Sequence, residues 1–84
     1  MAFLYILQSE TNSRYYIGST TDLQRRLPEH QRNQTPSTRH RGPWKLVYRE
    51  QFETGEEAHR RELQIKRWKS AKLIRELISR AEVG

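Results

Sequence analysis

The apolar segment Phe3-Leu4-Tyr5-Ile6-Leu7 closes the longest apolar run in this chain of 84 residues, which extends from Met1 to Leu7. A run this short cannot cross a bilayer, and no positively charged residue precedes it as in a signal peptide. Residues 3–8 instead alternate strand-favouring side chains between two faces, which is typical of a β-strand. We therefore expect an unprocessed, soluble, cytoplasmic protein with no membrane partner, whose fold begins with a strand over residues 3–8.

The size of the chain predicts one domain, over residues 1–84. A domain of 84 residues buries only about 60–65% of the surface that its unfolded chain exposes, so its core is small. The chain has no cysteine, which excludes a disulfide scaffold, a zinc ribbon, a thiol nucleophile and a cysteine redox sensor.

The first half of the chain predicts a hairpin followed by a helix. Turn-forming residues 9–14 precede a second strand over residues 15–17, which we expect Gly18 to end. Residues 20–22 supply a helix N-cap, and Pro28 predicts that this helix kinks or ends near His30. Residues 33–43 show no periodic pattern and predict a basic loop.

The second half predicts a third strand and two helices. Residues 45–52 resume an extended pattern, and the capping box Thr54-Gly55-Glu56-Glu57 begins a helix that runs to about Trp68. Ser70 caps a last helix, whose predicted apolar stripe consists of Leu73, Ile74, Leu77, Ile78 and Ala81. The order β-β-α-β-α-α predicts an α+β fold, with a three-stranded antiparallel sheet flanked by helices.

The positive charge lies in the second part of the sequence. The net charge is +6, and residues 1–30 sum to zero, so residues 31–84 carry all of it. Residues 31–49 hold five positive side chains and no acid, and residues 60–75 hold seven with the single acid Glu62. This pattern favours a surface that binds phosphates. A solvated basic surface that keeps a small domain soluble explains the charge equally well.

Two predicted helices place polar side chains within an apolar stripe. At 100° per residue, Glu62 lies within about 60° of both Ala58 and Ile65, so its carboxylate faces the core and needs an ion-pair partner, a metal or water. Arg26 is one candidate partner. On the first helix, His30 lies about 20° from Leu23 in angle, with Arg26 on its flank. A hydrogen-bonded core histidine and an ion-paired glutamate would also explain these residues.

These residues resemble the signature of the GIY-YIG nucleases. From Tyr5, steps of 11, 21 and 25 residues lead to Tyr16, Arg26 and His30, which is the register of that family. The first triplet is Leu4-Tyr5-Ile6, which keeps the tyrosine but departs from Gly-Ile-Tyr, and the second is Tyr16-Ile17-Gly18. Glu62 matches the family's metal-binding glutamate. The resemblance covers about residues 3–80 and is greatest to the small stand-alone bacterial members.

The resemblance implies a divalent-metal-dependent endonuclease that hydrolyses DNA phosphodiester bonds. It implies catalytic roles for Tyr5, Tyr16, Arg26, His30 and Glu62. Glu62 would bind the metal, and a single carboxylate indicates one Mg²⁺ or Mn²⁺ that keeps most of its water ligands. Arg26 would bind the non-bridging phosphate oxygens. Tyr5 would activate or orient the water, with His30 accepting its proton, and Tyr16 would bind phosphate or water; which tyrosine is the base stays open.

Further residues are candidates for nucleic-acid contacts. Gly18 would leave clearance for a phosphate, and the basic candidates are Arg39, Arg41, Lys66 and Lys69. A purely solvated role explains each basic residue as well. With no separate DNA-reading domain, we expect selectivity for DNA structure rather than sequence, in DNA repair or processing, with a protein partner as a further source of specificity.

Two other functions compete with the nuclease hypothesis. One is a nucleic-acid-binding module of the same fold that cuts weakly or not at all. The other is association with RNA or the ribosome, which the positive charge permits although no RNA-binding motif is present. Two departures from the family bear on activity: Pro28 lies between Arg26 and His30, and residues 74–77 lack the asparagine that many members carry there.

Overall fold

The computed structural model describes residues 1–26 and 43–83, so the predictions for Pro28, His30, Arg39 and Arg41 lie outside the described residues. Its strands are β1 (Ala2–Ser9), β2 (Tyr15–Thr20) and β3 (Trp44–Phe52), followed by the helices α2 (Gly55–Trp68) and α3 (Ala71–Val83). Residues 23–26 are also helical, up to the limit of the described part. The predicted fold class and element order are confirmed.

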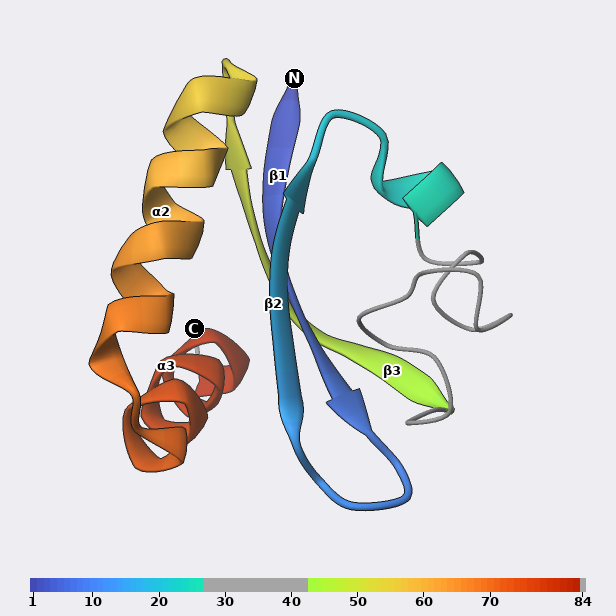
Figure 1. The fold of residues 1–84 in the computed structure, drawn as a ribbon, viewed down its shortest axis with the longest axis vertical. Helices are drawn as coiled ribbons and strands as arrows, with labels where there is room; N and C mark the ends of the chain where they lie inside the picture. The colour runs from blue at the N-terminus through green and yellow to red at the C-terminus, as the bar shows by residue number, and fades with distance from the viewer. Residues whose placement is uncertain (27–42, 84) are drawn as a thin grey trace.

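The strands form one antiparallel sheet in the order β2-β1-β3, so β1 is the central strand and β2 is an edge strand. Figure 1 shows α2 and α3 on one side of this sheet and the helical turn at residues 23–26 on the other. Because helices cover both faces, the residues of β1 from Leu4 to Leu7 are all buried. The side chains that alternate along residues 3–8 therefore point to two faces of the sheet, and both faces are buried along the middle of β1.

Each face of the sheet has its own apolar cluster. The first, which we call the helical face, consists of Leu4, Ile6, Ile17, Ile65, Ile74 and Ile78. The second, which we call the tyrosine face, consists of Tyr5, Leu7, Leu23 and Trp44, with Phe3 and Tyr16 packed against it. Helices α2 and α3 thus pack on one face of the sheet, whereas Tyr5 and Tyr16 lie on the other.

The prediction that Gly18 ends the second strand is wrong. β2 continues through Gly18 to Thr20, and Gly18 pairs directly with Tyr5 of β1. A Cβ on Gly18 would lie 2.6 Å from the Tyr5 hydroxyl oxygen, so the missing side chain makes room for the Tyr5 ring. The glycine is needed within the strand because an aromatic neighbour crosses it.

The predicted helix caps of α2 and α3 are confirmed. Thr54 Oγ1 accepts a hydrogen bond from the backbone N–H of Glu57 at 3.2 Å, and Ser70 Oγ accepts one from Leu73 at 3.3 Å. The apolar stripe of α3 is narrower than predicted: Ile74 and Ile78 are buried and Leu77 is partly buried, whereas Leu73 and Ala81 are exposed. Neither α2 nor α3 is long and apolar enough to cross a bilayer.

An ion pair fastens α2 to β3. The Arg61 guanidinium donates to both carboxylate oxygens of Glu50, with N–O distances of 3.1 to 3.2 Å, and both side chains are more than three-quarters buried. Arg61 also lies over the Trp68 ring, 5.7 Å from its centroid, and the Tyr48 hydroxyl donates to Glu50 at 2.5 Å. This network holds one flank of α2 against the sheet.

The network predicts a stability change at high pH. Burial raises the pKa of Tyr48 to about 12, and the Glu50 carboxylate that accepts its hydrogen bond acts in the same direction. Because this value lies above the ordinary 10, the stabilisation is complete below pH 10 and is lost as the pH rises toward 12. We expect Tyr48→Phe to remove this alkaline loss and a titration component of the ultraviolet absorbance near pH 12. An unchanged alkaline profile in Tyr48→Phe would contradict the assignment.

Candidate active site

Glu62 lies on the flank of α2 that faces β2. The residue is only 9% exposed, although its helix is otherwise polar on most sides. The Ser19 hydroxyl of β2 donates to Glu62 Oε1 at 2.7 Å, and Lys66 Nζ donates to Oε2 at 2.5 Å. His59 Nδ1 lies 3.6 Å from Oε1. The inward position predicted for Glu62 is therefore present, with partners from β2 and from α2 itself.

The contacts of Glu62 keep its carboxylate ionised. Burial raises the pKa of Glu62, but the hydrogen bonds from Lys66 and Ser19, with the positive charge of Lys66, outweigh it and hold the pKa below its ordinary value. A carboxylate that is nearly buried and still anionic is a strong oxygen ligand for a hard cation.

Tyr5 and Tyr16 meet on the tyrosine face. Tyr5 is 2% exposed, and its ring centroid lies 6.3 Å from that of Tyr16, with the planes tilted by 38°. Tyr16 in turn packs edge-on against Trp44 at 6.2 Å. Because the Tyr5 hydroxyl lies beside Gly18 of the edge strand, the ring spans from the centre of the sheet toward its edge.

Arg26 lies near the carboxyl end of β2. It is half-buried and lines a polar pocket of about 250 Å³ together with Thr20, Thr21, Asp22 and Arg25. Asp22 caps the turn, since its Oδ1 accepts a hydrogen bond from the Arg25 backbone at 3.2 Å. The pocket combines two guanidinium groups and two hydroxyls with the Asp22 carboxylate, so its positive charge is partly offset.

The described site residues converge on β2 from both sides of the sheet. The Tyr5 hydroxyl lies beside Gly18 on the tyrosine face, whereas the next residue, Ser19, binds Glu62 on the helical face. Arg26 follows just beyond the end of the same strand. The structure thus places Tyr5 and Tyr16 on the tyrosine face and Glu62 on the helical face, with Gly18 and Ser19 of the edge strand β2 between them.

The donor set suits a metal that keeps most of its water. Within residues 1–26 and 43–83, no group of three or more histidine, cysteine, aspartate or glutamate side chains is placed to hold an ion. A caged structural metal therefore does not fit the described residues. Mg²⁺ is commonly bound by one or two carboxylates, water and substrate phosphate, and Glu62 fits that pattern.

Three of the predicted phosphate contacts lie within the described residues, and their side chains have different neighbours. Lys66 is occupied by Glu62, whereas Lys69 is exposed at the C-cap of α2 in a left-handed conformation, with φ 48°. Gly18 is buried, and the Tyr5 ring fills the space that its missing side chain leaves.

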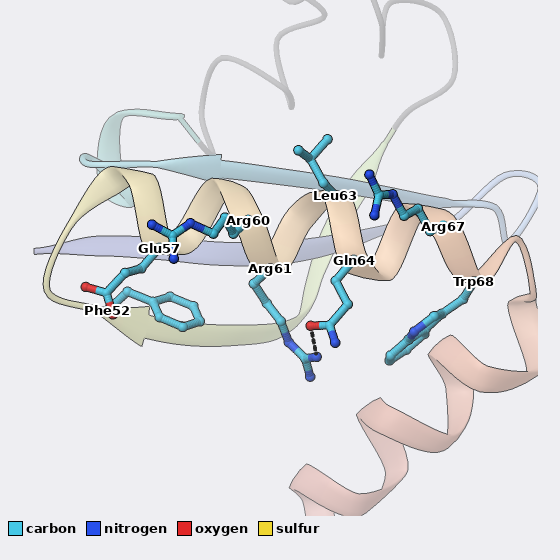
Figure 2. Close-up of a pocket in the computed structure, with 8 residues that line it drawn as sticks. All are labelled: Phe52, Glu57, Arg60, Arg61, Leu63, Gln64, Arg67 and Trp68. Carbon is cyan, nitrogen blue, oxygen red and sulfur yellow. Dashed lines mark hydrogen bonds between the residues drawn. The ribbon is translucent and has the colours of Figure 1, made fainter.

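A groove of about 740 Å³ lies on another part of α2, as Figure 2 shows, with Phe52, Arg61 and Trp68 among its lining residues. Arg61 is paired with Glu50, and Arg60, which also lines the groove, is paired with Glu56 at 2.9 Å. Two of the three arginines that line the groove are thus paired with acids, and Arg67 is the third.

Two features of this site were not predicted from the sequence. Ser19 was not among the candidate site residues, and its bond to Glu62 joins positions 43 residues apart. The Glu62–Lys66 pair, in contrast, has the i,i+4 spacing of helical ion pairs, which is a signal visible in the sequence.

The chain is similar to a known family and to several known proteins. The family model of the GIY-YIG catalytic domain matches residues 1–75. A UPF0213 protein of Streptococcus pneumoniae is 44% identical over 69 residues, which cover 81% of this chain and 69% of that protein. A UPF0213 protein of Staphylococcus saprophyticus is 38% identical over 78 residues, covering 88% of this chain and 94% of that protein.

A solved structure is also similar. The solution NMR structure of a UPF0213 protein from Bacillus halodurans has a TM-score of 0.59 and 36% sequence identity. The match covers 94% of this chain and 84% of that one.

Proposed function

This chain belongs to the GIY-YIG catalytic-domain family, whose members are generally endonucleases that act on DNA with a divalent metal, and we propose that it is itself such an enzyme. In this proposal it hydrolyses DNA phosphodiester bonds with Mg²⁺ or Mn²⁺, selects DNA by structure rather than sequence, and works in cytoplasmic DNA repair or processing. Membership is established by the match over residues 1–75, whereas the reaction and substrate are the proposal.

The observation that carries this proposal is that the Glu62 carboxylate is nearly buried and yet ionised. A carboxylate with 9% exposure that remains anionic is expensive to keep, because burial favours the neutral form. Helix α2 could place an apolar residue there at lower cost, since Ala58 and Ile65 on either side are fully buried. A metal-binding role would explain why a charged residue occupies this buried position beside β2. The bound ion would stabilise charge on the phosphate and on the leaving oxygen.

The other residues have roles that follow from their chemistry. Arg26 would hold the non-bridging phosphate oxygens through its planar set of N–H donors. Tyr5 would orient or deprotonate the attacking water, and Tyr16, whose ring lies 6.3 Å away, would hold phosphate or water beside it. A tyrosine with an ordinary pKa near 10 is a weak base at neutral pH, so His30 would accept the proton.

The proposal predicts steep salt dependence of DNA binding. Lys66 is paired with Glu62 in the metal-free protein, so three of the proposed phosphate contacts remain, from Arg39, Arg41 and Lys69. Three contacts imply a slope of about −2.7 for log affinity against log salt concentration, and a loss of about 40-fold between 50 and 200 mM salt. Fluorescence anisotropy with a labelled duplex in chelator measures this slope without cleavage. An affinity that is flat over this range would contradict the basic contact surface.

The reaction is tested on a labelled substrate panel of duplex, single-stranded, flap and branched DNA and an RNA. We expect cutting of at least one DNA with Mg²⁺ or Mn²⁺, and the preferred member identifies the DNA structure. Salt-sensitive binding without cutting in either metal would contradict the enzyme and favour a nucleic-acid-binding module. Cutting of the RNA alone would contradict DNA as the substrate.

A further inference from the structure

Each carboxylate oxygen of Glu62 is held by a different kind of donor. Ser19 Oγ donates to Oε1 from β2, a strand whose position is fixed by its pairing with β1. Lys66 Nζ donates to Oε2 from one helical turn along α2. His59 is the third neighbour, at 3.6 Å from Oε1. Ser19 is therefore a fixed neutral partner, whereas Lys66 supplies a full positive charge.

Lys66 is the partner that can leave. Its side chain is 48% exposed, whereas that of Glu62 is 12% exposed, so the ammonium group can move into water without disturbing the core. A lysine ammonium is a compact charge on a flexible stem, and it binds a carboxylate without the fixed geometry of an arginine. Ser19 would stay on Oε1 and hold the carboxylate in place while Oε2 changes partner.

We propose that Lys66 is an internal counterion of Glu62 that competes with the divalent metal for the same carboxylate. This inference rests on the proposed metal role of Glu62. Lys66 must leave Oε2 before that oxygen can bind a divalent cation, and its positive charge opposes the approach of another cation. The protein then binds metal more weakly than the carboxylate alone would, and the metal-free fold keeps the buried charge of Glu62 neutralised.

A purely structural ion pair would behave differently. Lys66 and Glu62 are spaced i,i+4, and such pairs stabilise a helix by about 0.3–0.5 kcal/mol. If stabilising α2 were the whole role of Lys66, its removal would lower stability and leave metal affinity unchanged or weaker. Competition predicts the opposite sign for metal affinity, so the two roles are separable by one measurement.

The test is Mn²⁺ binding at pH 7.5 in the absence of DNA, measured from the electron paramagnetic resonance signal of free Mn²⁺. We expect Lys66→Met to lower the Mn²⁺ dissociation constant by roughly 3- to 10-fold, because an internal competitor and a repulsive charge are both removed. Lys66→Arg keeps the charge and should bind Mn²⁺ as the natural protein does. Lys72→Met is the matched control, since it removes an exposed lysine from α3 and should leave the dissociation constant nearly unchanged.

Thermal unfolding gives a second readout without catalysis. A ligand that binds the folded state raises the melting temperature according to its affinity. At one Mn²⁺ concentration, the rise should therefore be larger for Lys66→Met than for the natural protein or Lys72→Met.

The outcomes separate this inference from the proposed function. If Glu62→Gln binds Mn²⁺ as well as the natural protein does, Glu62 is not the metal ligand, and the proposed metal role fails together with this inference. If binding requires Glu62 but Lys66→Met binds no tighter than Lys72→Met, the counterion role alone is overturned. Tighter binding in Lys66→Met, with Lys66→Arg unchanged, supports it.

Discussion

The Glu62→Gln variant is expected to lose DNA cleavage while remaining folded. Glutamine matches glutamate in size, and its amide oxygen can still accept the hydrogen bond from Ser19, so the packing of α2 on β2 is kept. The variant lacks the negative charge that binds the metal. Because a metal contributes several kcal/mol to stabilising the charge of the transition state, the cleavage rate should fall by about 10³-fold or more.

The control for this variant is Glu56→Gln. Glu56 lies on the same helix and also pairs with a basic residue, Arg60, but its side chain is 78% exposed. Removing this charge should change the cleavage rate less than about twofold, because an exposed ion pair contributes little. Circular dichroism and DNA anisotropy should show both variants folded and binding DNA. Equal loss of cleavage and of DNA binding in Glu62→Gln would contradict a metal-ligand role.

The Gly18→Ala variant should lose both stability and activity. The added Cβ would lie 2.6 Å from the Tyr5 hydroxyl oxygen and 2.7 Å from Cζ, closer than side-chain contacts allow. Tyr5 is 2% exposed, so its ring cannot move aside without disturbing the tyrosine face. We expect unfolding free energy to fall by about 1–3 kcal/mol, as in other overpacked cores. Displacement of the Tyr5 hydroxyl by about 1 Å should lower the cleavage rate by about 10²-fold.

Gly55→Ala is the matched control for this substitution. A Cβ on Gly55 meets only Thr21 Cγ2 at 3.6 Å, an ordinary contact, and neither glycine has a positive φ. Since Gly55 is the first residue of α2, alanine there should leave stability unchanged or raise it by about 0.4–1 kcal/mol. Urea unfolding measures both effects. A Gly18→Ala protein as stable and active as Gly55→Ala would contradict the proposed fit of Tyr5 over β2.

The elements and the inward position of Glu62 were predictable because they depend on local patterns. The angle of Glu62 relative to Ala58 and Ile65 is fixed by helical geometry, and the Thr54 cap is a four-residue motif. The end of the second strand was predicted wrongly because a glycine in a strand has two explanations. Only the cross-strand pairing of Gly18 with Tyr5 distinguishes a strand end from a gap that an aromatic ring fills.

Contacts between elements that are distant in the sequence could not be predicted from local sequence patterns. Arg26 was a candidate partner of Glu62, but in the structure Ser19 and Lys66 hold the carboxylate, because β2 passes beside this flank of α2. The Arg61–Glu50 pair depends likewise on how α2 lies on β3. On α3, Leu73 is 43% exposed because the helix buries only the narrow strip around Ile74 and Ile78.

The most direct measurement is the metal dependence of cleavage of the preferred DNA. The rate would be followed with Mn²⁺, after addition of a chelator, and after Mn²⁺ is restored in excess, with Glu62→Gln in parallel. We predict cutting that stops with the chelator, resumes with restored Mn²⁺, and is absent throughout in Glu62→Gln. Cutting that persists in the chelator, or that Glu62→Gln retains, would contradict a nuclease built around a metal at Glu62.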